Sequence, residues 1–147
     1  MLKKVGLGGT FDHLHEGHKY LLKIALSISE NIEIGLTTQD LLKNKQYSSK
    51  LENYQTRKKK LKNYISSITD LNRINIVEIS NWADMDECAQ DPEYEGLVVS
   101  QETYDNALKL NENRTKSGLN PLVLIVIPLL KDDNNNKISS TSIRAKL

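Results

Sequence analysis

The sequence is poor in cysteine, in long apolar runs and in excess charge of either sign. Cys88 is the one cysteine among 147 residues, so neither an intrachain disulfide nor a cysteine-based zinc cage can form. The longest apolar stretch, Leu122 to Leu130, has nine residues and contains Pro128, whereas a membrane-spanning helix needs about 20. The 20 Lys and Arg residues balance 19 Asp and Glu residues, for a formal net charge of +1. This balance argues against nucleic acid or an acidic membrane as the partner.

The length indicates one domain. A chain of 147 residues is close to the commonest domain size, and no linker or internal repeat divides it, so we expect a single domain over residues 1–147. The first residues lead directly into Gly-Gly-Thr-Phe-Asp, without the apolar region of a secretion signal. We therefore expect a cytoplasmic protein. No feature of the sequence specifies an oligomeric state.

Short apolar runs alternate with stretches of helical periodicity. The expected strands are Lys3 to Leu7, Asn31 to Thr37, Ile74 to Ile79, Gly96 to Ser100 and Leu122 to Ile127. The expected helices are Gly17 to Ser29, Lys50 to Thr69, Glu102 to Lys116 (capped by Gly118) and a short one from Ser139. This alternation predicts an α/β fold: a Rossmann-like, open, five-stranded parallel sheet with helices on both faces. The fifth run is almost wholly apolar, which favours a central strand.

The loop after the first strand combines glycines with all three histidines of the chain. It reads Gly-Gly-Thr-Phe-Asp-His-Leu-His-Glu-Gly-His over residues 8–18. Glycines let backbone amides approach an anion, the start of the next helix adds a positive field, and an imidazole can donate to a phosphate oxygen. The loop is neither a Walker loop nor the dinucleotide fingerprint, because Phe11 stands where that fingerprint has a glycine. It predicts a phosphate site that uses His15 and His18.

Two other interpretations of the histidines stay open. Histidines also cluster at metal sites, although no cysteine is close and the neighbouring Asp12 and Glu16 prefer harder ions. His13 or His15 could also simply cap the helix or pack. For His13 we favour this structural role.

A second group of polar residues closes the chain. Residues 138–144 read Ile-Ser-Ser-Thr-Ser-Ile-Arg, with four hydroxyl side chains and Arg144 after the fifth strand. One hydroxyl suffices to cap a helix. Several hydroxyls with a guanidinium at a helix start suit an oligophosphate, so the tail predicts a second phosphate-binding element.

Together these motifs resemble the nucleotidyltransferase superfamily that carries the His-x-Gly-His signature. Within it, the chain is similar to the archaeal and eukaryotic type of phosphopantetheine adenylyltransferase, over nearly its whole length. Further segments carry this resemblance: Ile34 to Thr38, Tyr54 to Arg57, Val98 to Thr103, Asn111 to Arg114 and Gly118 to Leu122. The resemblance implies the nucleotidyltransferase fold and transfer of AMP from ATP to 4′-phosphopantetheine, giving dephospho-coenzyme A and pyrophosphate.

The resemblance also implies roles for individual residues. His18, His15 and Thr10 would be catalytic. The residues implied to bind ATP are Gly8, Gly9, Thr10, Phe11, His15, His18, Ser100, Glu102, Ile138, Ser139, Ser140, Thr141 and Arg144. Thr10, Lys43 and Arg114 would bind the acceptor, with Lys45 as the alternative to Lys43. Mg²⁺ would arrive on the ATP phosphates, and no protein metal site is expected.

Two other functions stay open. Another transferase of the superfamily would join CMP to glycerol phosphate, or AMP to a flavin or nicotinamide nucleotide; Asn134 to Lys137 lacks the Arg-Thr-x-Gly typical of the cytidylyltransferases. A nucleotide sensor without turnover is the other possibility. Five of the six residues from Arg57 to Lys62 are basic, and we interpret them as a solvated helix face, with steering of polyanionic substrates as the alternative.

Overall fold

The computed structural model describes residues 1–38, 52–81, 90–100 and 104–127. Its elements in chain order are β1 (Leu2–Gly9), α1 (Glu16–Ile28), β2 (Ser29–Thr37), α3 (Tyr54–Ile68), the short 3-10 helix η2 (Leu71–Arg73), β3 (Ile74–Ile79), β4 (Gly96–Ser100), α5 (Tyr104–Lys116) and β5 (Val123–Ile127). All five expected strands and three of the expected helices are present. The helix expected from Ser139 lies outside the described residues.

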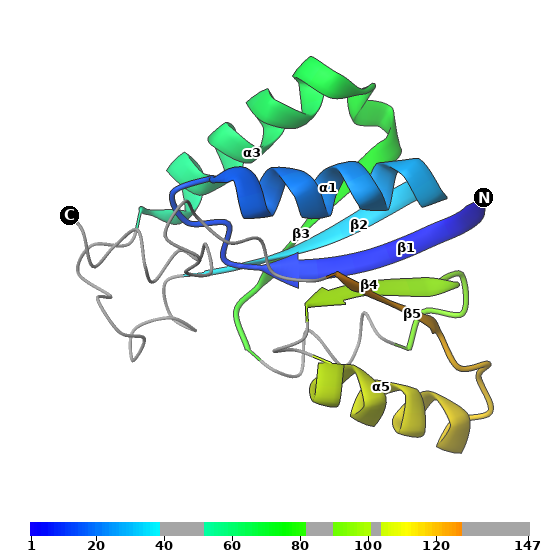
Figure 1. Ribbon diagram of the computed structural model, residues 1–147. Coiled ribbons are helices and arrows are strands. Elements are labelled where there is room, and N and C mark those ends of the chain that lie inside the picture. The colour runs from blue at the N-terminus through cyan, green and yellow to red at the C-terminus, as the bar shows by residue number, and fades with distance from the viewer. Residues whose placement is uncertain (39–51, 82–89, 101–103, 128–147) are drawn as a thin grey trace, which may run out of the picture.

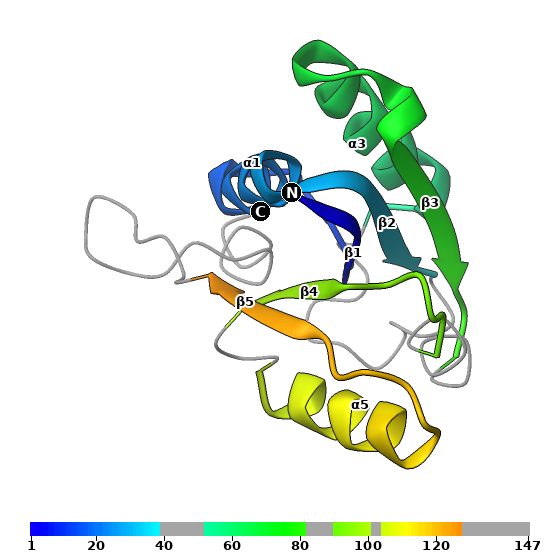
Figure 2. The ribbon, with the colours of Figure 1, turned by 90° about the vertical axis from the view of Figure 1, so that its right-hand side faces the viewer.

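The strands form one parallel sheet in the order β3-β2-β1-β4-β5. Helices α1 and α3 lie on one face of the sheet and α5 lies on the other (Figures 1 and 2). This confirms the predicted α/β fold with helices on both faces. The chain places β2 and β3 on one side of β1, then crosses back and places β4 and β5 on the other. Ligands of open parallel sheets bind at the carboxyl ends of the strands beside such a reversal.

The prediction that the fifth strand is central was wrong. Among the described strands β5 pairs with β4 alone and lies at the edge of the sheet, with Val123 56% and Val126 40% exposed. An apolar run shows that side chains on both faces of a strand can be buried. It carries no information on whether both edges of the strand are hydrogen-bonded, and this explains the error.

The core fills the space between the sheet and the two helices α1 and α3. Leu22, Ala25 and Leu26 on α1, and Leu61 and Ile65 on α3, are buried and repeat at three- or four-residue spacing. They pack against buried strand residues, chiefly Val5, Leu7, Ile32, Ile34 and Leu36. None of the described helices is both long and apolar enough to cross a membrane.

The amino edge of the sheet, where the strands begin, is held by two arginines that bond to backbone carbonyls. Arg73 donates to the carbonyl oxygens of Leu26, Ser29 and Glu30 at 2.7–3.1 Å. Arg114 is 2% exposed and donates to the carbonyl oxygens of Asn120, Asp91 and Tyr94. Each arginine therefore joins segments that are distant in sequence.

The end of α5 confirms the predicted glycine cap. Gly118 has φ +82°, a conformation that favours glycine. The amide of Leu119 donates to the Arg114 carbonyl at 2.9 Å, and that of Gly118 donates to the Thr115 carbonyl at 3.1 Å. This pair of bonds satisfies the last carbonyls of the helix.

Candidate active site

The first loop crosses the carboxyl edge of the sheet in a strained conformation. Phe11 and His13 both have positive φ, at 49° and 46°, although neither is glycine. Phe11 is 2% exposed, and its ring lies 5.2 Å from the His18 ring. Asp12 is fully buried and accepts a hydrogen bond from the Glu52 amide at 2.8 Å. Such backbone strain persists only where neighbours hold it, and it is concentrated at functional sites.

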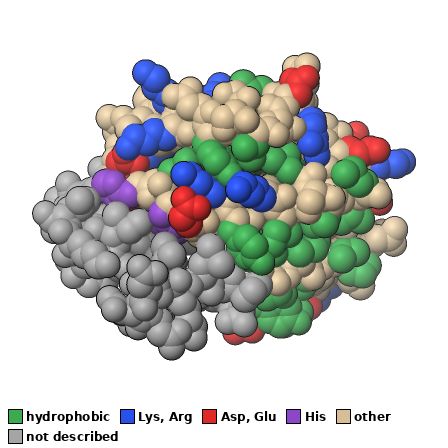
Figure 3. All heavy atoms as spheres, turned by 45° about the horizontal axis from the view of Figure 1, so that its top comes forward, with side chains coloured by type: hydrophobic (Ala, Val, Ile, Leu, Met, Phe, Trp, Pro, Cys, Tyr) green, Lys and Arg blue, Asp and Glu red, His purple; other side chains and the backbone are tan. Residues whose placement is uncertain are grey.

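The two histidines of the His-x-Gly-His motif start helix α1. His15 is the N-cap, and its Nδ1 accepts from the Gly17 amide at 3.0 Å. Nδ1 of His18 accepts from the His15 amide at 3.2 Å, which completes a reciprocal capping box. In Figure 3 histidine side chains reach the surface at the end of the molecule where α1 begins. In the capping box, His15 and His18 take the positions that Ser and Glu occupy in its common form.

This cap determines where each imidazole carries its proton. A neutral imidazole has one N–H, and because both Nδ1 atoms accept hydrogen bonds, the proton resides on Nε2. The rings stack with centroids 3.7 Å apart and planes 21° apart. Nε2 of His15 is buried and has no hydrogen-bond partner in the described part of the chain. The motif thus places two stacked imidazoles, each with an Nε2–H group, at the helix start.

Both imidazoles are neutral near pH 7. Burial lowers the pKa of His15 from 6.5 to about 4, against a smaller opposing effect of the Glu16 carboxylate. Burial, and then the neighbouring His15, lowers the pKa of His18 to about 3. The two groups therefore act as neutral hydrogen-bond donors rather than as cations.

Two threonine hydroxyls meet where β1 and β2 end. Oγ1 of Thr37 lies 3.4 Å from Oγ1 of Thr10 and 3.5 Å from the Gly9 carbonyl oxygen. Next to it, Thr38 is 8% exposed, and its hydroxyl has no hydrogen-bond partner in the described ranges. The sequence reasoning did not single out Thr37 or Thr38. The available signal was their position, with Thr37 as the last residue of an expected strand and Thr38 as the next residue, because carboxyl ends of parallel strands meet at one edge.

Arg57 is a buried residue of this region that the sequence reasoning misassigned. Its side chain is fully buried, so the interpretation of the basic run as a solvated face was wrong at this position. Its guanidinium donates to the carbonyl oxygens of Thr10 at 2.9 Å, Thr37 at 2.7 Å and Glu52 at 3.0 Å. Lys59, Lys60 and Lys62 are exposed, as the interpretation requires.

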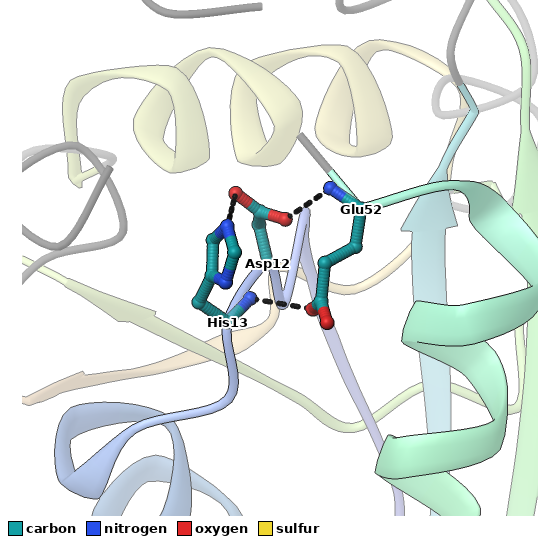
Figure 4. A group of neighbouring side chains, drawn as sticks. All are labelled: Asp12, His13 and Glu52. Atoms are coloured by element: carbon teal, nitrogen blue, oxygen red, sulfur yellow. Dashed lines mark hydrogen bonds and ion pairs between the residues drawn. The ribbon is translucent and has the colours of Figure 1, made fainter. Parts of the chain in front are cut away.

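One cluster of possible metal ligands lies beside the loop, formed by Asp12, His13 and Glu52 (Figure 4). Its groups already bond to one another. The His13 amide donates to Glu52 Oε1 at 2.8 Å, and His13 Nε2 lies 3.6 Å from Asp12 Oδ2. Lys60 pairs with Glu52, and Arg57 interacts electrostatically with Asp12. Because two cations already compensate the two carboxylates, the cluster fits a network that ties the loop to the start of α3 better than a metal site.

The structure brings seven of the expected residues to the carboxyl edge: Gly8, Gly9, Thr10, Phe11, His15, His18 and Ser100. Seven expected residues and the alternative Lys45 lie outside the described residues: Lys43, Lys45, Glu102, Ile138, Ser139, Ser140, Thr141 and Arg144.

Arg114 is not at this site. It belongs to the last turn of α5, and the carbonyls it bonds belong to Asp91 and Tyr94 before β4 and to Asn120 before β5. It is therefore at the amino edge, and its guanidinium is used by backbone groups. The expectation that Arg114 binds the acceptor does not fit this placement.

Comparisons with known proteins agree on one family. The Cytidylyltransferase-like family model matches residues 7–146. A phosphopantetheine adenylyltransferase from Pyrococcus abyssi is 43% identical over 99% of this chain and 90% of its own length. One from Saccharomyces cerevisiae is 37% identical over 96% of this chain and 47% of its own length.

Solved structures show the same fold. A crystal structure of a protein with unknown function from Archaeoglobus fulgidus has a TM-score of 0.71 and 30% identity, covering 92% of this chain and 99% of that one. A bifunctional NMN adenylyltransferase/ADP ribose pyrophosphatase from Francisella tularensis, complexed with AMP and a Mn ion, has a TM-score of 0.69 at 15% identity, covering 99% of this chain and 41% of that one. With its His-x-Gly-His loop, its sheet order and these relatives, the chain belongs to the phosphopantetheine adenylyltransferases of the cytidylyltransferase-like family.

Proposed function

We propose that this chain transfers the adenylyl group of ATP to 4′-phosphopantetheine, forming dephospho-coenzyme A and pyrophosphate. The observation that carries the proposal is the stacked pair His15 and His18, whose neutral rings present Nε2–H donors at the start of α1. The family of the chain, with relatives 43% and 37% identical, supports the choice of acceptor. The acceptor then reaches the carboxyl edge beside Thr10 and Thr37.

The reaction proposed is a direct in-line displacement. An oxygen of the acceptor phosphate forms a bond to the α-phosphorus of ATP, and the bond to the bridging oxygen of the β-phosphate breaks, so that pyrophosphate leaves. The acceptor phosphate has a second pKa of about 6 and is already anionic near pH 7. No general base is required, and the work of the protein is positioning and charge stabilisation.

The proposed roles follow from this chemistry. Nε2–H of His18 would donate to the α-phosphate as its charge grows, His15 would donate to a neighbouring ATP phosphate, and Thr10 would orient the acceptor phosphate. The remaining residues proposed for the ATP side are Gly8, Gly9, Phe11, Ser100, Glu102, Ile138, Ser139, Ser140, Thr141 and Arg144. Lys43, or Lys45 in its place, is proposed to meet the acceptor phosphate.

Mg²⁺ is proposed to enter as part of the nucleotide, bound to its phosphates and neutralising the leaving pyrophosphate. This needs no dedicated set of protein ligands. It is compatible with the cluster of Asp12, His13 and Glu52, in which Lys60 pairs with Glu52 and Arg57 interacts electrostatically with Asp12. The absence of nucleic acid or membrane partners and a cytoplasmic location stay predictions.

The test is pyrophosphate release from MgATP with and without 4′-phosphopantetheine. Parallel reactions contain CTP with glycerol phosphate, ATP with FMN, and ATP with nicotinamide mononucleotide. Release with phosphopantetheine alone supports the proposal. Release with another acceptor would keep the mechanism and replace the substrate. A protein that binds ATP and releases no pyrophosphate in any reaction would be a nucleotide sensor.

A further inference from the structure

The geometry points to Arg57 as a positioning residue that holds Thr10 and the end of β2 in place for the acceptor phosphate. The inference rests on the proposed function, because it assigns to Thr10 the orientation of the attacking group. The side chain of Arg57 is itself fully buried. It acts through the backbone of other residues rather than by touching a substrate.

The bonds of Arg57 join three segments at this edge. Nη1 donates to the carbonyls of Thr10 in the first loop and Thr37 at the end of β2, and Nε donates to Glu52 just before α3. The side chain starts in the first turns of α3, at a position in line with the buried Leu61 and Ile65. Arg57 thus lies on the face of α3 that packs into the hydrophobic core.

A guanidinium suits this task for reasons of geometry and charge. Its planar fork carries five donors in fixed directions, so it can serve three carbonyls at once, whereas an ammonium is a point charge on a flexible stem. Its charge is buried beside the carboxylate of Asp12, which compensates it. The ring of Tyr54 covers the guanidinium at 5.7 Å. Substitution by Lys keeps the charge and loses the fork.

Arg57 is connected to the proposed reaction through the hydroxyls of Thr10 and Thr37. The carbonyls that Arg57 holds belong to Thr10 and Thr37, and the hydroxyls of the same two residues lie 3.4 Å apart. The residue after Thr10 is Phe11, at φ 49°, so the chain leaves Thr10 in a strained conformation. Releasing the Thr10 carbonyl would let that strain relax and move the hydroxyl. A displacement of about 1 Å in a positioning group can cost about 10²-fold in rate.

Arg73 provides a matched control at the amino edge. It also donates to three backbone carbonyls, those of Leu26, Ser29 and Glu30, and so also joins separate segments. It has no bond to the first loop. Arg57→Met and Arg73→Met each remove three bonds to backbone carbonyls, Arg73→Met also removes one to the Thr69 hydroxyl, and only Arg57→Met removes support from Thr10.

The experiment compares the parent protein with Arg57→Met, Arg57→Lys and Arg73→Met, well below the melting temperature of each. Steady-state pyrophosphate release gives kcat/KM for phosphopantetheine, and equilibrium binding gives the ATP Kd. Hydrogen exchange of peptides that span residues 8–14 reports on the loop without any substrate. We expect Arg57→Met to lower kcat/KM for the acceptor about 10²-fold and to speed exchange in the loop, with the ATP Kd within about threefold. Arg57→Lys should fall between Arg57→Met and the parent, and Arg73→Met should change the melting temperature alone.

The outcomes test the inference and the proposed function separately. If Arg57→Met lowers the melting temperature and leaves kcat/KM and loop exchange like those of Arg73→Met, the inference is overturned. If Arg57→Met does not fold, Arg57→Lys carries the same comparison. If the parent releases no pyrophosphate with phosphopantetheine, the proposed function fails. Loop exchange in the same variants then decides separately whether Arg57 holds Thr10.

Discussion

The two edges of the parallel sheet differ in how fully their polar side chains are paired. At the amino edge Arg73 and Arg114 donate to backbone carbonyls, and Lys4 lies 2.9 Å from Asp91 and 3.1 Å from Glu33. At the carboxyl edge the buried His15 Nε2 and Thr38 Oγ1 have no partner within the described ranges. The positive φ angles of the two non-glycine residues, Phe11 and His13, also occur at this edge.

This difference indicates that the amino edge contributes mainly to the stability of the fold and the carboxyl edge mainly to its function. A buried polar group without a partner costs about 1–3 kcal/mol, and a strained backbone residue costs a similar amount. The carboxyl edge therefore keeps the less stable arrangement, in which His15 Nε2 and the Thr38 hydroxyl have no hydrogen-bond partner among the described residues. The amino edge supplies compensating bonds. Substitutions at the amino edge should change stability alone, whereas substitutions at the carboxyl edge should change catalysis first.

The largest expected effect is that of His18 at the carboxyl edge. His18→Ala should lower kcat about 10²–10³-fold, as for loss of one donor to a developing negative charge, with the ATP Kd comparatively unchanged. His18→Gln is the matched variant, because its amide oxygen can replace Nδ1 in the capping box. We expect it to keep the melting temperature and still lose turnover. Near-normal kcat in His18→Ala would remove the catalytic role.

The second prediction concerns Arg114 at the amino edge. Arg114→Met leaves three carbonyls without their donor, that of Tyr94 in a buried bond and those of Asp91 and Asn120 in partly buried ones. It should lower the free energy of unfolding by about 3 kcal/mol, measured by denaturant titration. The values of kcat/KM for both substrates should stay within about twofold of the parent. A selective rise in KM for phosphopantetheine would restore Arg114 as an acceptor-binding residue and break the comparison between the edges.

The third prediction is a pH dependence of stability. The folded pKa values of about 4 and about 3 for His15 and His18 lie below the unfolded value of 6.5. The unfolded chain therefore binds more protons below pH 6.5, and stability falls as the pH falls. The loss between pH 6.5 and pH 5 should be about 1–2 kcal/mol at these half-buried rings. Urea titrations should show a smaller slope in the double variant His15→Gln, His18→Gln, and an equal slope would contradict the lowered pKa values.

The smallest expected effect is at the end of α5. Gly118→Ala forces alanine into φ +82°, and an added Cβ would have no atom within 4 Å, so the cost is conformational strain of about 1 kcal/mol. A thermal melt measures the loss of stability, and the rate of pyrophosphate release should not change. A change in rate would show that the amino edge communicates with the site.

The fold could be predicted because its signals are local. Alternation of short apolar runs with helical periodicity located all five strands, and the glycine and histidine content of the first loop located the edge that carries the site. The place of β5 in the sheet depends on pairing between strands, which an apolar run does not encode.

The roles of the buried arginines could have been found by helical spacing. Arg57 lies four residues before Leu61 and eight before Ile65, on the buried face of α3, and Arg114 lies seven after the buried Ala107 on α5. A charged residue on an apolar face indicates a buried guanidinium with partners. Spacing could not identify those partners, since two of the three carbonyls around each arginine come from segments distant in sequence. The tail from Ile138 to Arg144 lies outside the described residues and stays a prediction.

The capping box at the start of α1 also protects the site from transition metals. A neutral imidazole has one lone pair available to a metal ion, on the nitrogen without hydrogen. In His15 and His18 that nitrogen is Nδ1, and its lone pair already accepts a backbone N–H. A zinc or nickel ion could bind the pair only after both rings change tautomer and the helix loses its first bonds. The protein can thus place two adjacent histidines at the carboxyl edge without offering a chelating site to the metals that histidine pairs usually attract.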